Sequence, residues 1–299
     1  MLLPLTNITF DTLYGKIYTD KNITVTVARL DKIHSDVSGN KLFKLHYFVK
    51  ACLQTSHKTL LTFGGAFSNH LVATAYLCNA NNLISIGIIR GEKPVQLSHT
   101  LIRCMKLGMQ LKFVSRVNYK ENGSELLSNL STQFGDFIMV PEGGYNNEGA
   151  KGASLIMDVV NRDIYTHICT CVGTGTTLAG LLLKKKLHQQ IIAIPVIKNM
   201  TDIFERLNFL KIEENNKPII FNEYHFGGYA KCTEELITFM NSFYEEEKIP
   251  TDFVYTAKMM YAVTDKLKND YFQSGSNILC LHTGGLQGNK SLKENRLIF

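Results

Sequence analysis

The stretch TLLTFGGAFSNHLVATAYLCNA, residues 59–80, carries the pattern that decides the fold. A short apolar run predicts a buried strand, Gly64 and Gly65 predict a turn, and the amphipathic run after them predicts a helix. A strand that passes through a glycine turn into a helix is typical of a parallel βα unit. We therefore expect a parallel sheet with helices packed on it.

The same alternation of short apolar runs and longer amphipathic runs continues to the end of the chain. Strands that alternate with helices imply right-handed crossovers in parallel sheets. The apolar runs are too numerous for one small sheet, and the glycine-rich segment from Pro141 to Gly152 is the best candidate for a crossing between domains. We predict an α/β protein of two parallel-sheet domains with helices on both faces. The smaller domain covers residues 44–148, and the larger covers residues 1–43 and 149–299.

Composition narrows the class of protein. With 299 residues, 45% hydrophobic and 19% charged, the chain is long and apolar enough for large cores. The net charge of +6 is spread out, which favours a solvated basic surface over a nucleic-acid site. The seven cysteines lack CxxC pairs and nearby histidines at metal spacing, so we expect a reducing compartment and no metal site. We find neither a signal peptide nor an apolar membrane segment, and we expect a cytoplasmic protein.

Loops that follow strands deserve inspection, because ligands of parallel sheets bind at the carboxyl ends of the strands. In the loop of residues 62–70, Ser68 stands at the start of a helix as either an N-cap or a site residue. The loop of residues 171–180 is a glycine turn that could cradle a single phosphate or simply pack a helix on a strand. Two later loops carry Tyr229 and Tyr255, which could equally be core residues.

The segment VSGNKLFKLHYFV, residues 37–49, places Lys41 and Lys44 three residues apart where the pattern turns helical. Residues at this spacing share a helix face, so both ammonium groups point the same way near the positive end of the helix. Two cations placed there attract an anion or lose a proton. A lone lysine would more simply be a solvated surface residue.

Taken together, six motifs form a recognisable set. SGNKLFKL, GGAFSNH, the Gly-Thr loop, GGYAK, VYTAK and HTGGLQG occur in this order between Arg29 and Gly288. The chain thereby resembles the family of 1-aminocyclopropane-1-carboxylate deaminases and D-cysteine desulfhydrases. The resemblance implies a tryptophan synthase β-type fold, pyridoxal 5'-phosphate as cofactor, a small amino-acid substrate and a homodimer. From charge and hydropathy we expect no nucleic-acid or membrane partner.

The resemblance also assigns roles to the lysines and to the loop of residues 62–70. It implies that Lys41 forms the Schiff base with the cofactor and that Lys44 helps to hold the cofactor phosphate. It places Ser68 beside the carboxylate and Cα of the substrate. It gives Asn69 a hydrogen bond to the phenolic oxygen of the cofactor.

The remaining implied roles lie in the second half of the chain. Tyr229 and Tyr255 approach the substrate, and Thr256 faces the pyridine nitrogen. The phosphate loop consists of Thr174, Gly175, Thr176 and Thr177.

Position 256 bears on the reaction. Family members that open the cyclopropane ring resemble one another in having a glutamate there, whereas Thr256 would hold a neutral ring nitrogen and favour β-elimination. We therefore expect elimination to a 2-oxo acid and ammonia, as in the D-cysteine desulfhydrase branch. Deamination of a cyclopropane or hydroxy amino acid on the same fold remains an alternative, as does a binding protein without turnover.

The chain departs from the family pattern at several positions. Phe67 replaces a glutamine beside Ser68, and Ala257 replaces the glycine after the Tyr-Thr pair. Leu42 and Phe43 are also atypical between the two lysines. Phe67 is expected to remove a polar group from beside the substrate.

Overall fold

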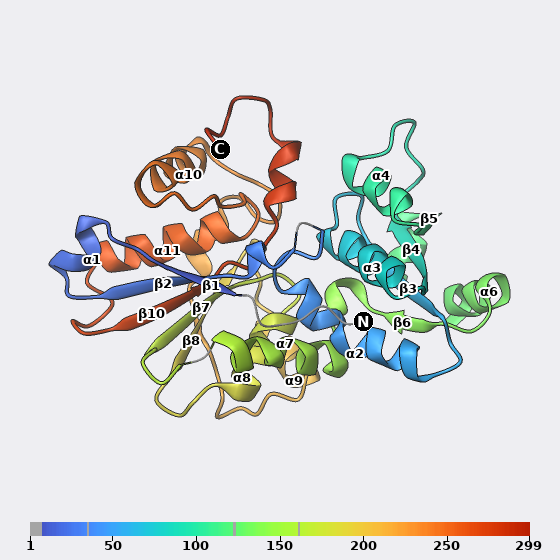
Figure 1. Cartoon of the computed structure of the whole chain (residues 1–299), viewed down its shortest axis with the longest axis horizontal. Helices are drawn as coiled ribbons and strands as arrows, with labels where there is room; N and C mark the ends of the chain where they lie inside the picture. Colours follow the sequence, from blue (N-terminus) through green and yellow to red (C-terminus); the bar gives the residue numbers. More distant parts are fainter. Residues whose placement is uncertain (1–7, 35, 122–123, 161) are drawn as a thin grey trace.

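The computed structural model describes residues 8–34, 36–121, 124–160 and 162–299, which form two sheets side by side (Figure 1). The larger sheet has six strands in the order β1-β2-β10-β7-β8-β9. These strands are β1 (Thr9–Thr12), β2 (Thr24–Arg29), β10 (Asn277–Leu281), β7 (His167–Val172), β8 (Gln190–Pro195) and β9 (Ile219–Ile220). All neighbours in this sheet pair in parallel except β1, which runs antiparallel to β2.

The smaller sheet has four parallel strands in the order β5-β4-β3-β6. They are β5 (Gln110–Val114), β4 (Ile84–Arg90), β3 (Thr59–Gly64) and β6 (Ile138–Val140). The run at residues 59–64 is the central strand β3, and its six residues are buried. The predicted α/β class with parallel sheets is therefore confirmed.

Helices cover both faces of the larger sheet. Figure 1 shows α10 (Glu234–Glu247) and α11 (Thr256–Lys268) on one face, with α7 (Asn147–Val160), α8 (Thr176–Lys184) and α9 (Ile203–Phe209) on the other. Strand β7 explains this arrangement, because Ile168 and Val172 belong to one buried core while Cys169 and Cys171 belong to the other. All seven cysteines are free thiols.

The other helices complete the two layers. Helix α3 (Asn69–Ala80) follows β3 and packs against α4 (His99–Lys106), and α2 (Lys41–Gln54) packs against α3 and α7. The shorter helices are α1 (Lys16–Asp20), α5 (Arg116–Glu121) and α6 (Ser124–Phe134), with 3₁₀ turns η1 (Leu30–Lys32), η2 (Glu142–Gly144), η3 (Asn222–His225) and η4 (Leu286–Ser291). None of the helices in the described residues is long and apolar enough to cross a membrane.

The two sheets are joined by shared packing around α2. Leu45 of α2 belongs to one hydrophobic core together with Leu60 and Val140 of the smaller sheet and Ile168 and Leu279 of the larger. One hydrophobic core thus contains residues of both sheets. The predicted division into residues 44–148 and the rest of the chain stays a prediction.

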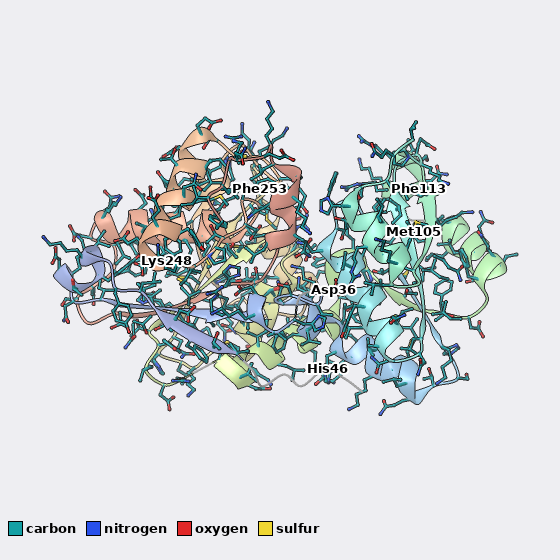
Figure 2. The ribbon with its side chains drawn as sticks, turned by 45° about the horizontal axis from the view of Figure 1, so that its top comes forward. Asp36, His46, Met105, Phe113, Lys248 and Phe253 are labelled. Atoms are coloured by element: carbon teal, nitrogen blue, oxygen red, sulfur yellow. The ribbon has the colours of Figure 1, made fainter. Side chains whose placement is uncertain are left out.

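Side-chain contacts also cross from one sheet's elements to the other's. Asp36, which Figure 2 places near the junction, accepts two hydrogen bonds from the Arg103 guanidinium of α4, at 2.6 and 2.8 Å. The His34 and Tyr76 rings lie 4.2 Å apart between their centroids. The segment that leads into α2 is therefore anchored to the helices of the smaller sheet.

Candidate active site

The start of α2 is fixed by a close backbone contact. Gly39 has a φ of +75°, and a Cβ atom there would lie 1.8 Å from the Thr283 carbonyl oxygen. Only glycine fits such an approach. Asn40 Nδ2 then donates a hydrogen bond of 2.7 Å to Thr177 Oγ1, which ties the start of α2 to the start of α8. The motif SGN thus brings two helix N-termini together.

Lys41 is the first residue of α2, and Lys44 lies one turn further along. Burial lowers the pKa of Lys41 to about 8, although the charge of Asp252 partly offsets this effect. Burial and the charge of Lys41 lower the pKa of Lys44 to about 7. The Lys41 Nζ atom lies 5.5 Å from the centroid of the Tyr255 ring. Near neutral pH, both amines are therefore neutral, and so nucleophilic, in a larger fraction than an ordinary exposed lysine.

The Gly-Thr loop lies at the carboxyl end of β7. Gly175 has a φ of +93° and precedes α8, while the hydroxyl oxygens of Thr174 and Thr176 are 2.9 Å apart. A Cβ atom on Gly143 would approach Thr174 Cγ2 to 2.8 Å, and one on Gly144 would contact Lys44 Cβ at 3.5 Å. The turn η2 therefore lies between Lys44 and the loop. Helix N–H groups and a nearby lysine can together bind a phosphate.

The loop of residues 62–70 and the start of α2 contribute polar atoms that lack partners among the described residues. Ser68 occupies the N-cap position of α3, but its hydroxyl makes no capping hydrogen bond. Asn69 Oδ1 and Asn40 Oδ1 are buried without a hydrogen-bond partner among the described residues. Buried polar atoms without partners are rare in proteins, and they are expected where a ligand supplies the missing bonds.

His70 is a buried residue that sequence reasoning overlooked. The Thr62 hydroxyl donates to the Val140 carbonyl oxygen and lies 2.9 Å from His70 Nε2, so its oxygen accepts a hydrogen bond from the Nε2–H group. His70 Nδ1 is then a bare acceptor, and it has no partner among the described residues. Burial and the charges of Lys44 and Lys41 lower the pKa of His70 to about 3. Its place directly after Ser68 and Asn69 was the available signal.

The two tyrosines meet at the start of α11. Tyr255 precedes α11, and its hydroxyl lies 3.5 Å from the hydroxyl of Tyr229. A Cβ atom on Gly173 would lie 3.6 Å from the Tyr255 hydroxyl, so this ring borders the Gly-Thr loop. Burial and the neighbouring Tyr229 raise the pKa of Tyr255 well above its usual range. Tyr255 therefore keeps its proton.

Thr256 is fully buried and forms hydrogen bonds with Asp252. Asp252 is the second site residue that sequence reasoning missed. Its hydroxyl donates to Asp252 Oδ1 at 2.7 Å and accepts from the Asp252 backbone N–H at 2.8 Å. The Asp252 carboxylate also accepts from the backbone N–H groups of Val254, Tyr255 and Thr256. The hydroxyl proton of Thr256 therefore points at a carboxylate, and the oxygen keeps one lone pair for another donor.

The structure also places two of the departures from the family pattern, Phe67 and Ala257. Phe67 is 58% exposed, and its ring lies 5.8 Å from the His99 ring. Ala257 is fully buried in a core cluster with Leu236 and Met240. Phe67 therefore contacts α4, while Ala257 fills space in the core.

These features fit the cofactor that the motifs imply. Pyridoxal phosphate brings a phosphate, an aldehyde, a phenolic oxygen and a ring nitrogen. Lys44 and the Gly-Thr loop suit the phosphate, and the partly neutral amine of Lys41 suits the aldehyde. Asn40 Oδ1, Asn69 Oδ1 and His70 Nδ1 lack partners among the described residues and are available to bind a polar ligand.

Comparisons with known proteins agree with this picture, although no family model matches the chain. A Thermotoga maritima protein, provisionally named 1-aminocyclopropane-1-carboxylate deaminase, is 30% identical over 272 residues, covering 84% of this chain and 85% of that protein. The bifunctional D-cysteine desulfhydrase/1-aminocyclopropane-1-carboxylate deaminase of Arabidopsis thaliana is 29% identical over 88% of this chain and 72% of its own length.

A solved structure shares the fold. The crystal structure of an ACC deaminase homologue superposes with a TM-score of 0.81 at 23% identity, over 97% of this chain and 92% of that one. The chain therefore belongs to the family of 1-aminocyclopropane-1-carboxylate deaminases and D-cysteine desulfhydrases, and it is a pyridoxal-phosphate-dependent deaminating lyase.

Proposed function

We propose that the enzyme removes the Cα proton and the β-substituent of a small amino acid and releases a 2-oxo acid and ammonia. From D-cysteine and water the products would be pyruvate, sulfide and ammonia. The observation that carries the proposal is the amine of Lys41, whose pKa is about 8 and which lies 5.5 Å from the Tyr255 ring centroid. An amine with this pKa could both hold the cofactor and act as a base.

In this proposal, each residue of the candidate site would have a distinct role in binding or proton transfer. Bound pyridoxal phosphate would supply the electron sink that makes the Cα proton acidic. Lys41 would bind the cofactor covalently and, once the substrate amine displaces it, take the proton from Cα. Lys44 and the Gly-Thr loop would hold the phosphate, and Ser68 with Asn69 would orient the substrate and the ring.

The tyrosine pair would serve as a proton donor and a wall of the site. Tyr255 keeps its proton because its pKa is raised, so its hydroxyl can donate to a departing group. Tyr229 is 51% exposed and lies at the solvent side of Tyr255, where it would limit access of water. A smaller domain of residues 44–148 closing over the cofactor would complete that exclusion.

Thr256 supports elimination, since the resemblance gives ring-opening members a glutamate at this position. The direction of its hydrogen bond, however, keeps deamination of 1-aminocyclopropane-1-carboxylate as a second candidate. Because the proton of Thr256 points at Asp252, the threonine would offer the ring nitrogen a lone pair, which favours a protonated nitrogen and a stronger electron sink. The names of the relatives carry both activities.

The test is the release of 2-oxo acid from D-cysteine, L-cysteine, D-serine and 1-aminocyclopropane-1-carboxylate by the cofactor-loaded enzyme. Lys41→Ala should lower turnover by at least about 10³-fold, as expected when a reacting group is removed. Lys50→Ala is the matched control, because Lys50 lies on the same helix but is exposed. Turnover in Lys41→Ala equal to that of the unmodified enzyme would refute the assignment.

Assembly and location belong to the same proposal. The resemblance supports a homodimer, which light scattering would detect as about twice the chain mass of 33.7 kDa. The seven free thiols support a reducing location such as the cytoplasm.

A further inference from the structure

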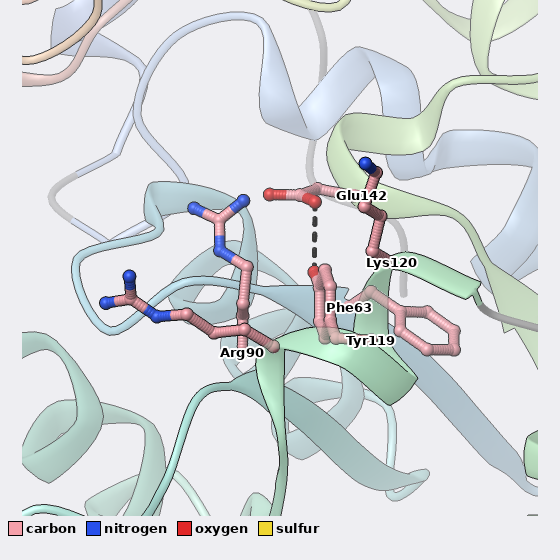
Figure 3. A pocket seen from close by; sticks show the side chains of 6 residues that line it. Phe63, Arg90, Tyr119, Lys120 and Glu142 are labelled. Carbon is pink, nitrogen blue, oxygen red and sulfur yellow. Dashed lines mark hydrogen bonds between the residues drawn. The ribbon is translucent and has the colours of Figure 1, made fainter.

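A polar pocket of about 610 Å³ lies at the carboxyl edge of the smaller sheet (Figure 3). Its walls come from the ends of the strands or from the segments that follow them. They are Phe63 of β3, Arg90 of β4, Arg116, Tyr119 and Lys120 of α5, and Glu142 of η2. This is the edge of a parallel sheet where ligands bind, yet none of these residues has a part in the proposed reaction.

The pocket has an excess of positive charge. Arg90, Arg116 and Lys120 line it, against the single carboxylate of Glu142. That carboxylate accepts a hydrogen bond of 3.0 Å from the Tyr119 hydroxyl, as Figure 3 shows. The guanidinium of Arg90 lies 5.7 Å from the centroid of the Tyr119 ring, which helps to hold it in place.

The two arginines have no carboxylate partner among the residues that the structure describes. By contrast, Arg29, Arg103 and Arg206 each form an ion pair with an aspartate. Guanidinium groups present several N–H donors in a planar fork that matches a carboxylate, sulfonate or phosphate. Two such groups facing one pocket therefore form a site that is complementary to an oxyanion.

The pocket adjoins the candidate active site along two of its walls. A Cβ atom on Gly65 would lie 3.4 Å from a terminal nitrogen of Arg90, and Gly65 begins the loop that carries Ser68. On the other side, Glu142 is followed by Gly143 and Gly144, where an added Cβ atom would lie 2.8 Å from Thr174 Cγ2 and 3.5 Å from Lys44 Cβ, respectively. A ligand in the pocket would therefore lie next to a substrate held at Lys41.

The geometry points to a binding site for an anionic group, supplied by the distal acid of an amino-acid substrate or by a free oxyanion. We favour the substrate as the source because Arg90 borders the loop of Ser68. In this form the inference rests on the proposed function and specifies its substrate class as amino acids with a second acidic group. Binding of a free oxyanion, by contrast, depends only on the residues of the pocket and not on the proposed function.

The first arm of the test compares two substrates of nearly equal shape. S-carboxymethylcysteine carries a distal carboxylate, whereas S-carbamoylmethylcysteine carries a neutral amide. We expect kcat/KM to favour the carboxylate by at least about tenfold, and Arg90→Gln and Arg116→Gln each to reduce that ratio severalfold. Arg162→Gln is the control, because it removes the same charge from an exposed arginine that stacks on Phe10.

The second arm measures binding of inorganic phosphate to the holoenzyme by calorimetry, with the cofactor already occupying the Gly-Thr loop. Phosphate binding that Arg90→Gln weakens, without any preference between the two substrates, would identify a free oxyanion as the ligand. The absence of both results, the substrate preference and arginine-dependent phosphate binding, would overturn the inference. Since the second arm requires no turnover, a failure of the proposed reaction would be recognised separately, and unchanged thermal unfolding would show that the variants are folded.

Discussion

At the scale of single residues, the site works by removing water from charged groups. Lys41, Lys44 and His70 all have lowered pKa values, and burial is the largest cause for each. Each cation also raises the cost of charging its neighbours, so the cluster favours neutral amines and a neutral imidazole. Asp252 acts in the opposite direction, since its charge favours the ammonium form of Lys41.

This balance predicts a pH dependence for the loading of the cofactor. Only the neutral amine of Lys41 can attack an aldehyde, so the rate of loading should rise with pH and level off above about 8. Asp252→Asn removes the charge that favours the ammonium form, so its midpoint should lie at a lower pH. The visible absorbance of the bound cofactor after mixing would report the rate.

The matched control for this experiment is Asp270→Asn, because Asp270 is an exposed carboxylate paired with Lys21. It should leave the midpoint unchanged. A midpoint that moves to higher pH in Asp252→Asn would contradict the assigned electrostatics. A second reference is the same reaction with a free alkylamine, which separates the titration of Lys41 from that of pyridoxal phosphate itself.

At the scale of elements, the site depends on where helices begin. Helices α2, α3, α8 and α11 all start at it, and the starts of α2 and α8 are joined by the bond from Asn40 to Thr177. Their N-termini supply unpaired N–H groups and positive potential. The close contact between Gly39 and Thr283, which follows β10, brings the start of α2 near the larger sheet and so helps to position Lys41.

A pair of glycines tests the importance of that contact. Gly39 and Gly135 have similar φ angles, +75° and +71°, but only Gly39 has atoms within 4 Å of the Cβ position. Gly135→Ala should cost about 1 kcal/mol of unfolding free energy through backbone strain alone. Gly39→Ala should cost at least about 2 kcal/mol more, because the new methyl would collide with the Thr283 carbonyl. Urea unfolding would measure both, and equal costs would show that the contact is unimportant.

At the scale of the whole molecule, the two sheets are parts of one folded unit. Leu45 of α2 packs in the same core as residues from both sheets, and the ion pair of Asp36 with Arg103 joins segments on either side. Proteins with a shared core usually unfold cooperatively, whereas domains with separate cores often unfold in steps.

We therefore expect a single thermal transition in calorimetry, even though the chain forms two sheets. Leu45→Ala should cost about 3 kcal/mol and shift the whole transition, because Leu45 is fully buried. Leu53→Ala is the control, since Leu53 lies on the same helix and is 40% exposed. Two separable transitions, with only one of them moved by Leu45→Ala, would show that the sheets unfold independently.

The sequence by itself determined the class of fold, and it led to the prediction of the main site residues. Strands such as β3 and β7 were predictable because a buried parallel strand must be continuously apolar, and the turns after them because they need glycine. Lys41 and the Gly-Thr loop could be named because their motifs are local in the sequence. The antiparallel strand β1 gave no comparable signal, since its four residues are mostly half-buried.

Only the tertiary structure decided how distant residues act on one another. The pKa values of the lysines depend on burial, the hydrogen bond of Thr256 depends on Asp252, and His70 becomes an acceptor only through Thr62 and Val140. Arg90 and Arg116 likewise share a pocket only because parallel strands end at a common edge. The local sequence shows which side chains a segment carries. The protonation state of those side chains, the direction of their hydrogen bonds and their fit to a ligand depend on the atoms that folding places around them.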